Sequence, residues 1–190
     1  VLQRQQHDEL PPLLFQYRDY AHWQRQWMTS LACVRQLEYW RTQLSNAPAY
    51  HSLPINRRST EPTNHLAVNV SLTADIDLTT QLIELANDKQ VTLFMLLHGI
   101  LAILLSRHSN SDDIVIGTPV ANRVTADLEP LIGFFVNTLV LRAHCDENQL
   151  LADFLAHIKH INLAAQDNQF IPFSYLVEKL KPSRSAGVSP

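Results

Sequence analysis

The 190-residue sequence predicts an α/β fold, and three observations support that prediction. Over several long segments, apolar residues recur at steps of three and four, which is typical of amphipathic helices. Other segments are shorter and are either continuously apolar or alternate between apolar and polar residues, as strands do. The two kinds of segment alternate along the chain. This alternation indicates helices packed on a sheet.

The first elements are a long helix and a strand. A helix is expected over about 19–46, with one apolar face, and Pro48 and Pro54 mark its end. Residues 65–73 alternate perfectly between polar and apolar side chains, which predicts a half-buried strand. The apolar face of the long helix comprises Trp23, Trp27, Leu31, Val34, Leu37, Trp40 and Leu44.

Two helices follow, each with a candidate N-terminal cap. Asp75 or Asp77 can cap a helix that ends near Lys89, because a short polar side chain accepts hydrogen bonds from the first free amides. Thr92 can cap the next helix, expected over 93–108. That helix is apolar nearly all round, which predicts a central position.

The second half of the chain predicts two strands and two helices. The strands are expected over 113–117 and about 135–143, and the helices over about 149–165 and 172–181. About three strands are few for this number of helices and would leave apolar edges exposed. We therefore expect the complete fold to continue beyond one or both ends of the chain.

Composition excludes several classes of protein. Fifteen lysines and arginines against eighteen aspartates and glutamates give a net charge of −3, which argues against a nucleic-acid or anionic-membrane surface. The longest apolar run has about 13 residues, whereas a membrane span needs about 20. Cys33 and Cys145 are too few for a disulfide framework and are expected to be buried thiols. These features predict a soluble, cytoplasmic unit.

Familiar catalytic and metal motifs are missing. His157 and His160 lie three apart on one expected helix but lack a third ligand at a suitable spacing, so no metal site is predicted. The loop 117–123 follows a strand but lacks the Gly-Lys-Ser/Thr ending of a phosphate loop. There is no Gly-x-Ser-x-Gly. His108 and Asp112 lie in a polar turn, where a solvated connection is the simpler interpretation.

Polar residues do occur in the otherwise apolar strand near 135–143. Because side chains alternate, Asn137 lies on one face of this strand while Thr138 and Arg142 lie on the other. A buried amide needs hydrogen-bond partners, so Asn137 either completes a backbone network or faces a ligand channel. Arg142 implies a carboxylate partner.

Four segments, in order, carry a recognisable pattern. YRDYAHW (17–23) is similar to Tyr-x-Asp-Tyr-Ala-x-Trp, and IGFFVNTL (132–139), with Arg142, to Ile-Gly-x-Phe-Val-Asn-Thr…Arg. NQFIPFSYLV (168–177) is similar to His-Gln-x-x-Pro-Phe-x-x-Leu-Val, and 181–190 to an Arg-Ser…Ser-Pro segment. Together they resemble the condensation domain of nonribosomal peptide synthetases over essentially the whole chain.

This resemblance implies a fold like chloramphenicol acetyltransferase, with two similar lobes around a channel. Residues 1–16 would be the lead-in from the N-terminal lobe, and 17–190 part of the C-terminal lobe. The implied reaction is peptide-bond formation between aminoacyl or peptidyl thioesters, each carried on the 4′-phosphopantetheine of a carrier domain. No cofactor would bind directly. The implied partners are carrier domains, an adjacent adenylation domain and the rest of the same condensation domain, with no nucleic acid and no membrane.

The resemblance also assigns residues. The family's catalytic His-His-x-x-x-Asp-Gly lies upstream of the first motif and is absent here, so this chain is expected to be inactive alone and to hold no catalytic residue. Asn168 stands where the family commonly has His, which weakens any titrating role there. The expected channel residues are Gly133, Asn137 and Thr138. The expected structural residues are Tyr17, Asp19 as a helix N-cap, Trp23, Arg142, Pro172 and Phe173.

Two alternatives remain open at this stage. The chain could belong to a non-catalytic module that docks carrier proteins, with exposed arginines meeting acidic carrier helices. It could also belong to a relative of the same fold that cyclises residues or transfers acyl groups, and the upstream segment would decide. The arginines in question are Arg18, Arg25, Arg35 and Arg41.

Overall fold

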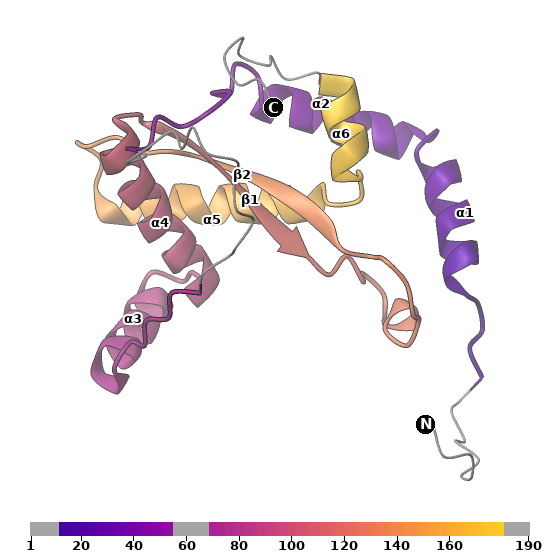
Figure 1. Cartoon of the computed structure of the whole chain (residues 1–190), viewed down its shortest axis with the longest axis horizontal. Coiled ribbons are helices and arrows are strands. Elements are labelled where there is room, and N and C mark those ends of the chain that lie inside the picture. Colours follow the sequence, from indigo (N-terminus) through magenta and orange to yellow (C-terminus); the bar gives the residue numbers. More distant parts are fainter. Residues whose placement is uncertain (1–11, 55–68, 181–190) are drawn as a thin grey trace, which may run out of the picture.

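A computed structural model describes residues 12–54 and 69–180 of the chain (Figure 1). The described residues form both helices and a sheet, which confirms the predicted α/β class, although the strands follow four helices instead of alternating with them. In chain order the elements are α1 (Tyr17–Trp27), α2 (Leu31–Gln43), α3 (Ile76–Asp88), α4 (Leu93–Ser109), β1 (Asp113–Val120), the short 3-10 helix η1 (Ala126–Leu128), β2 (Asn137–His144), α5 (Leu151–Asp167) and α6 (Phe173–Leu180).

The two strands form an antiparallel hairpin around which the helices are arranged. Asp113 pairs with His144 at one end and Val120 with Asn137 at the other, so β1 runs three residues further than the sequence predicts. The third predicted strand, over 65–73, is wrong in its described part. Residues 69–73 form no strand, and the side chains of Val70 and Leu72 are 92% and 98% exposed. Alternation alone cannot make a strand without a neighbour to pair its backbone.

Helices α4 and α5 cover one side of the hairpin, and Figure 1 shows α5 running behind it. The shared core joins apolar side chains of both helices to Ile114 and Ala143 of the strands. A methyl group added at Gly99 of α4 would lie 3.2 Å from the Phe154 ring, so a small residue here allows the helices to approach closely. The apolar residues that α4 and α5 contribute to this core include Met95, Leu96, Ala102, Phe154, Leu155, Ile158 and Ile161.

Helix α4 is less central than the sequence predicts. In the part of the chain that the structure describes, α4 is covered only in part, and seven of its large apolar residues are exposed: Leu93, Phe94, Leu97, Ile100, Leu101, Ile103 and Leu104. None of the described helices is long and apolar enough by itself to cross a membrane. Helices α3 and α4 meet that criterion only as a pair, bent by 102°.

The predicted helix over 19–46 is two helices, separated by residues 28–30 and set at a clear angle in Figure 1. The Thr29 hydroxyl donates to the Gln26 carbonyl at 2.8 Å, and the Ser30 hydroxyl accepts from the Cys33 amide at 3.2 Å. Hydroxyl side chains compete with the backbone in this way, so one helix ends and a capped second helix begins. The new helix buries Cys33 and Trp40 but leaves Leu31 and Val34 exposed, contrary to the predicted apolar face.

Candidate functional site

Asn137, at the start of β2, holds the connection between α5 and α6. Its Nδ2 donates to the carbonyls of Gln169 and Ile171, both at 2.8 Å, and its Oδ1 accepts from the Phe173 amide at 3.0 Å. The residue is 8% exposed. Of the two interpretations left open by the sequence, the contacts match the backbone network. A channel role for Asn137 stays a prediction.

The adjoining motif residues lie at the start of α6, where Phe173 is the first helical residue and Pro172 precedes it. The first amides of a helix have no partner within it, and Asn137 supplies the acceptor for the Phe173 amide. Pro172 has no amide to satisfy, and its carbonyl accepts from Leu176 at 3.0 Å. A strand residue therefore positions the N-terminus of a helix that follows it by more than thirty positions.

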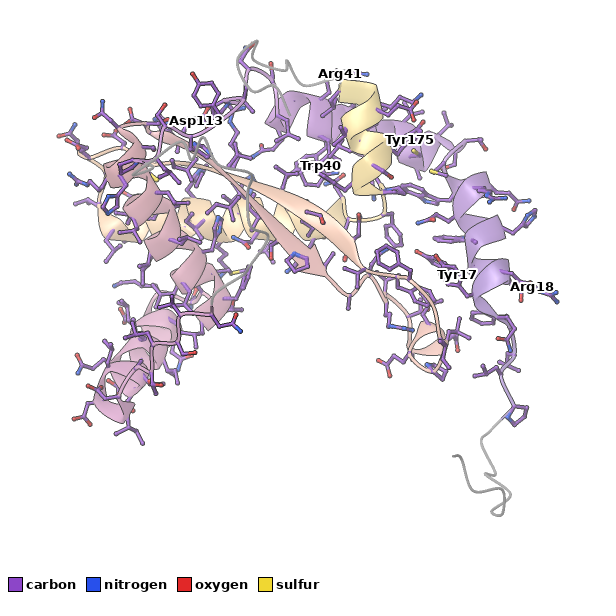
Figure 2. The ribbon with its side chains drawn as sticks, viewed as in Figure 1. Tyr17, Arg18, Trp40, Arg41, Asp113 and Tyr175 are labelled. Carbon is purple, nitrogen blue, oxygen red and sulfur yellow. The ribbon has the colours of Figure 1, made fainter. Side chains whose placement is uncertain are left out.

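Gly133 is explained by Tyr17. The Tyr17 hydroxyl donates to the Phe134 carbonyl at 3.0 Å, and its ring lies directly against Gly133. A Cβ atom at 133 would overlap the Tyr17 ring at Cδ2, so no side chain fits in this arrangement. Figure 2 shows Tyr17 at the inner side of α1, with Arg18 pointing outward. The contact joins the first and second motifs; the channel role predicted for Gly133 is not tested by it.

A second tyrosine of the first motif, Tyr20, packs beside Tyr17, with ring centroids 5.9 Å apart. The sequence alone did not assign it a role. Its ring centroid lies 4.7 Å from that of Phe135, and its hydroxyl accepts from Asn122 Nδ2 at 3.3 Å. The guanidinium of Arg123 lies 4.2 Å from the centroid of the Phe135 ring. Burial raises the pKa of Tyr20, which keeps its hydroxyl protonated.

Two further predictions for α1 need correction or refinement. Asp19 is not the N-cap: Gln16 occupies that position, and Asp19 Oδ2 accepts from the Gln16 amide at 2.8 Å from three residues inside the helix. Trp23 is 43% exposed, so it is not a core residue of the described part. Its ring still contacts neighbours, with centroids 5.7 Å from Tyr20 and 6.2 Å from Phe170.

The carboxylate partner predicted for Arg142 is Asp113. Arg142 Nε and Nη2 donate to the two oxygens of Asp113 at 2.8 and 2.7 Å, a bidentate pair. Nη1 donates to the carbonyls of Gln43 and Ser45 at 2.9 and 2.7 Å. The bond to Asp113 raises the pKa of Arg142. One charged side chain thus ties the hairpin to the C-terminal end of α2, where a cation is favourable.

The predicted site residues do not all converge. Asn137 and Thr138 are neighbours on β2 and point to opposite faces of the hairpin, as the alternation requires. Asn168 donates its side-chain amide to the Ala164 carbonyl at 2.8 Å, and its backbone carbonyl accepts from Trp40 Nε1 at 2.9 Å. Cys33 and Cys145 are buried free thiols, as predicted. In residues 12–54 and 69–180, no three His, Cys, Asp or Glu side chains lie close enough together to hold a metal ion.

The amino-acid sequence of this chain is similar to those of known proteins. The family model described as "Condensation domain" matches residues 2–190. A dimodular nonribosomal peptide synthase of Bacillus subtilis (strain 168) is 38% identical over 188 residues, which is 96% of this chain and 8% of that protein.

Solved structures are also similar. The complex of the X-domain and OxyB from teicoplanin biosynthesis matches with a TM-score of 0.81 at 26% identity, over 96% of this chain and 41% of that one. The four-domain nonribosomal peptide synthetase holo-AB3403, bound to AMP and glycine, matches with a TM-score of 0.78 at 29% identity, over 87% of this chain and 13% of that one. The chain thus spans less than half of the length of each of these proteins.

Proposed function

Because the chain belongs to the condensation-domain family, we propose that it is part of a condensation domain that forms peptide bonds in nonribosomal peptide synthesis. The observation that carries the proposal is the match of the family model over residues 2–190. The contacts among its motif residues support it, because Tyr17 with Gly133, and Asn137 with Phe173, join motifs far apart in the sequence.

In the proposed reaction, the free amine of an acceptor aminoacyl thioester attacks the carbonyl carbon of a donor thioester. A C–N bond forms, the donor C–S bond breaks, the donor carrier's thiol leaves, and the amine loses a proton. Both substrates would arrive on the 4′-phosphopantetheine arms of carrier domains, with an adenylation domain as neighbour. Since the thioester is already activated, holding the two reactants together is the main contribution expected of the domain.

Within that domain, we assign residues 17–190 to the C-terminal lobe and 1–16 to the lead-in from the N-terminal lobe. Gly133, Asn137 and Thr138 would lie beside the channel. The bonds of Asn137 to the α5–α6 connection make it a positioning residue in this proposal, one that fixes the wall rather than touches the reacting atoms. The chain alone would be inactive, because it holds no His-His-x-x-x-Asp-Gly segment.

A second candidate is a docking module without catalysis. The similarity to an X-domain solved in complex with OxyB favours it, because that structure shows a protein of this fold holding a partner. In this chain, Arg18 of α1 and Arg41 of α2 are both exposed, and each is paired with a neighbour on its own helix, Arg18 with Asp19 at 3.7 Å and Arg41 with Glu38 (Figure 2). Exposed arginines of this kind suit an acidic partner helix, but ordinary solvation is the simpler explanation of them.

The test compares the parent synthetase with the 190-residue chain, each supplied with two loaded carrier proteins. The dipeptidyl product on the acceptor carrier is measured by mass spectrometry. We expect product from the parent and none from the chain alone. Product from the chain alone would contradict the assignment of catalysis to an upstream segment. A parent that binds loaded carriers tightly but forms no peptide with any pair would favour the docking module.

A further inference from the structure

A pocket of about 230 Å³ lies where α4 and α5 meet the hairpin. It is at the end of the hairpin where β1 stops and β2 begins, and Pro119 and Val120 on its rim pair with Thr138 and Asn137. The pocket therefore adjoins two of the residues expected beside the channel. Its lining comprises Phe94, Thr118, Pro119, Val120, Leu139, Leu141, Asn162 and Gln166.

Asn162 is the buried polar group of this lining, only 2% exposed. Its Nδ2 donates to the Ile158 carbonyl at 2.7 Å and lies 3.0 Å from Nδ1 of His98. Both amide protons are therefore used within the core. In the part of the chain that the structure describes, the side-chain carbonyl oxygen of Asn162 accepts no hydrogen bond, so it can accept one from a bound molecule.

His98 supports the same interpretation. Because the Asn162 amide can only donate, Nδ1 of His98 accepts and the ring proton lies on Nε2. Nε2 is buried and has no hydrogen-bond partner among the described residues. The His98 ring stacks on Phe94, a wall of the pocket, with centroids 6.5 Å apart. Unpaired buried polar groups are rare in folded proteins, so the unpaired Nε2 of His98, which lies behind a wall of the pocket, needs an explanation.

The composition of the lining restricts what can bind. Leu139, Leu141 and Phe94 supply an apolar frame, while Asn162, Gln166 and Thr118 supply a few hydrogen-bonding groups, the usual make-up of a small-molecule site. None of the described residues that line the pocket is charged, so a charged group would have no partner among them. The volume of about 230 Å³ is that of about eight water molecules, at about 30 Å³ each, and suits one side chain rather than a whole substrate.

We propose that this pocket receives an uncharged polar side chain, a hydroxyl or a carboxamide, of an aminoacyl thioester substrate, and that Asn162 and Gln166 select it. The inference rests on the proposed function and adds a specificity site to it. A site that hydrogen-bonds a substrate group discriminates strongly against an analogue without that group, because its own polar atoms are then left unpaired.

The test uses the complete condensation domain with seryl, asparaginyl and alanyl thioesters on carrier proteins, each supplied once as donor and once as acceptor. In the unmodified domain we expect kcat/KM to be at least about tenfold higher for the seryl or asparaginyl substrate than for the alanyl one, in one of the two positions. The double variant His98→Leu/Asn162→Leu removes both buried polar partners together, which avoids leaving one unpaired. It should lower that ratio by about tenfold.

Gln166→Leu gives an independent test, because Gln166 is exposed and its replacement does not disturb the core. It should lower the ratio to a smaller extent. Gln81→Leu is the matched control: it makes the same change at an exposed position of α3 outside the pocket and should leave the ratio unchanged. An unmodified domain without preference, or variants that keep the preference, would overturn the inference.

A binding readout separates this inference from the proposed function. The soluble N-acetylcysteamine thioester of serine should raise the thermal midpoint of the unmodified domain more than the N-acetylcysteamine thioester of alanine does. The double variant should show no such difference between the two thioesters. No peptide from any substrate pair would refute the proposed function, whatever the midpoints show. Peptide formation with equal midpoints and equal ratios would refute the specificity site alone.

Discussion

The three hydrogen bonds of Asn137 predict a large effect of a minimal substitution. Asn137→Asp keeps the size of the side chain and the oxygen that accepts from Phe173, but it replaces the Nδ2 donor with an acceptor. The carbonyls of Gln169 and Ile171, each 2.8 Å from Nδ2, then lose their partner and face an oxygen. An unsatisfied buried group costs about 1–3 kcal/mol, so the loss of two bonds predicts a fall of about 2–6 kcal/mol in the free energy of unfolding.

The assay is urea unfolding of the complete condensation domain, together with amide hydrogen exchange of the peptide that covers residues 169–176. Asn87→Asp makes the same chemical change at an exposed position of α3, where a change within about 0.5 kcal/mol is expected. In Asn137→Asp, we expect a lower urea midpoint and faster exchange in that peptide. Unchanged stability and exchange with reduced peptide formation would refute this reasoning and would indicate direct contact with substrate.

Three further predictions follow from other contacts. Arg142→Lys loses the bidentate geometry with Asp113 and should lower the free energy of unfolding by about 1–3 kcal/mol in urea titration; an unchanged midpoint would show that a single charge suffices. Gly133→Ala places a methyl group against Tyr17 and should cost about 1–3 kcal/mol, and the cost should shrink in a Tyr17→Ala background if that contact is its cause. Burial lowers the pKa of His98, so the unfolded chain binds this proton more readily than the folded one, and stability should fall as the pH drops below the ordinary value of 6.5. His98→Leu should flatten the dependence of the urea midpoint between pH 7.5 and 5.5; an equal slope in both proteins would assign the effect to other groups.

Local signals predicted several elements well. Asp75 and Thr92 cap α3 and α4 as expected, with bonds of 2.7 Å to the Leu78 amide and 3.2 Å to the Met95 amide. Each cap depends on a side chain and a backbone amide three residues apart, which a sequence displays directly. The break between α1 and α2 is also local, but the apolar steps of three and four continue across Thr29 and Ser30 and conceal it.

Non-local features were only partly predictable. The sequence showed that Arg142 needs a carboxylate, but several acidic residues were available, and only the strand pairing brings Asp113 within reach. The Tyr17–Gly133 contact joins residues more than a hundred positions apart, and no spacing rule indicates it. His98 was visible as a polar residue in an apolar run, whereas its partner Asn162 becomes significant only once α4 and α5 cross.

The anchoring of α2 by Arg142 also has a consequence for how the chain is made. The Gln43 carbonyl at the end of α2 accepts from a side chain 99 positions later. At about 5–20 residues per second, a ribosome adds that many residues in about 5–20 s. During this interval the end of α2 has neither its cation nor the hairpin against which it packs. The N-terminal helices therefore have to remain unassembled, and accessible to chaperones, until β2 has left the ribosome.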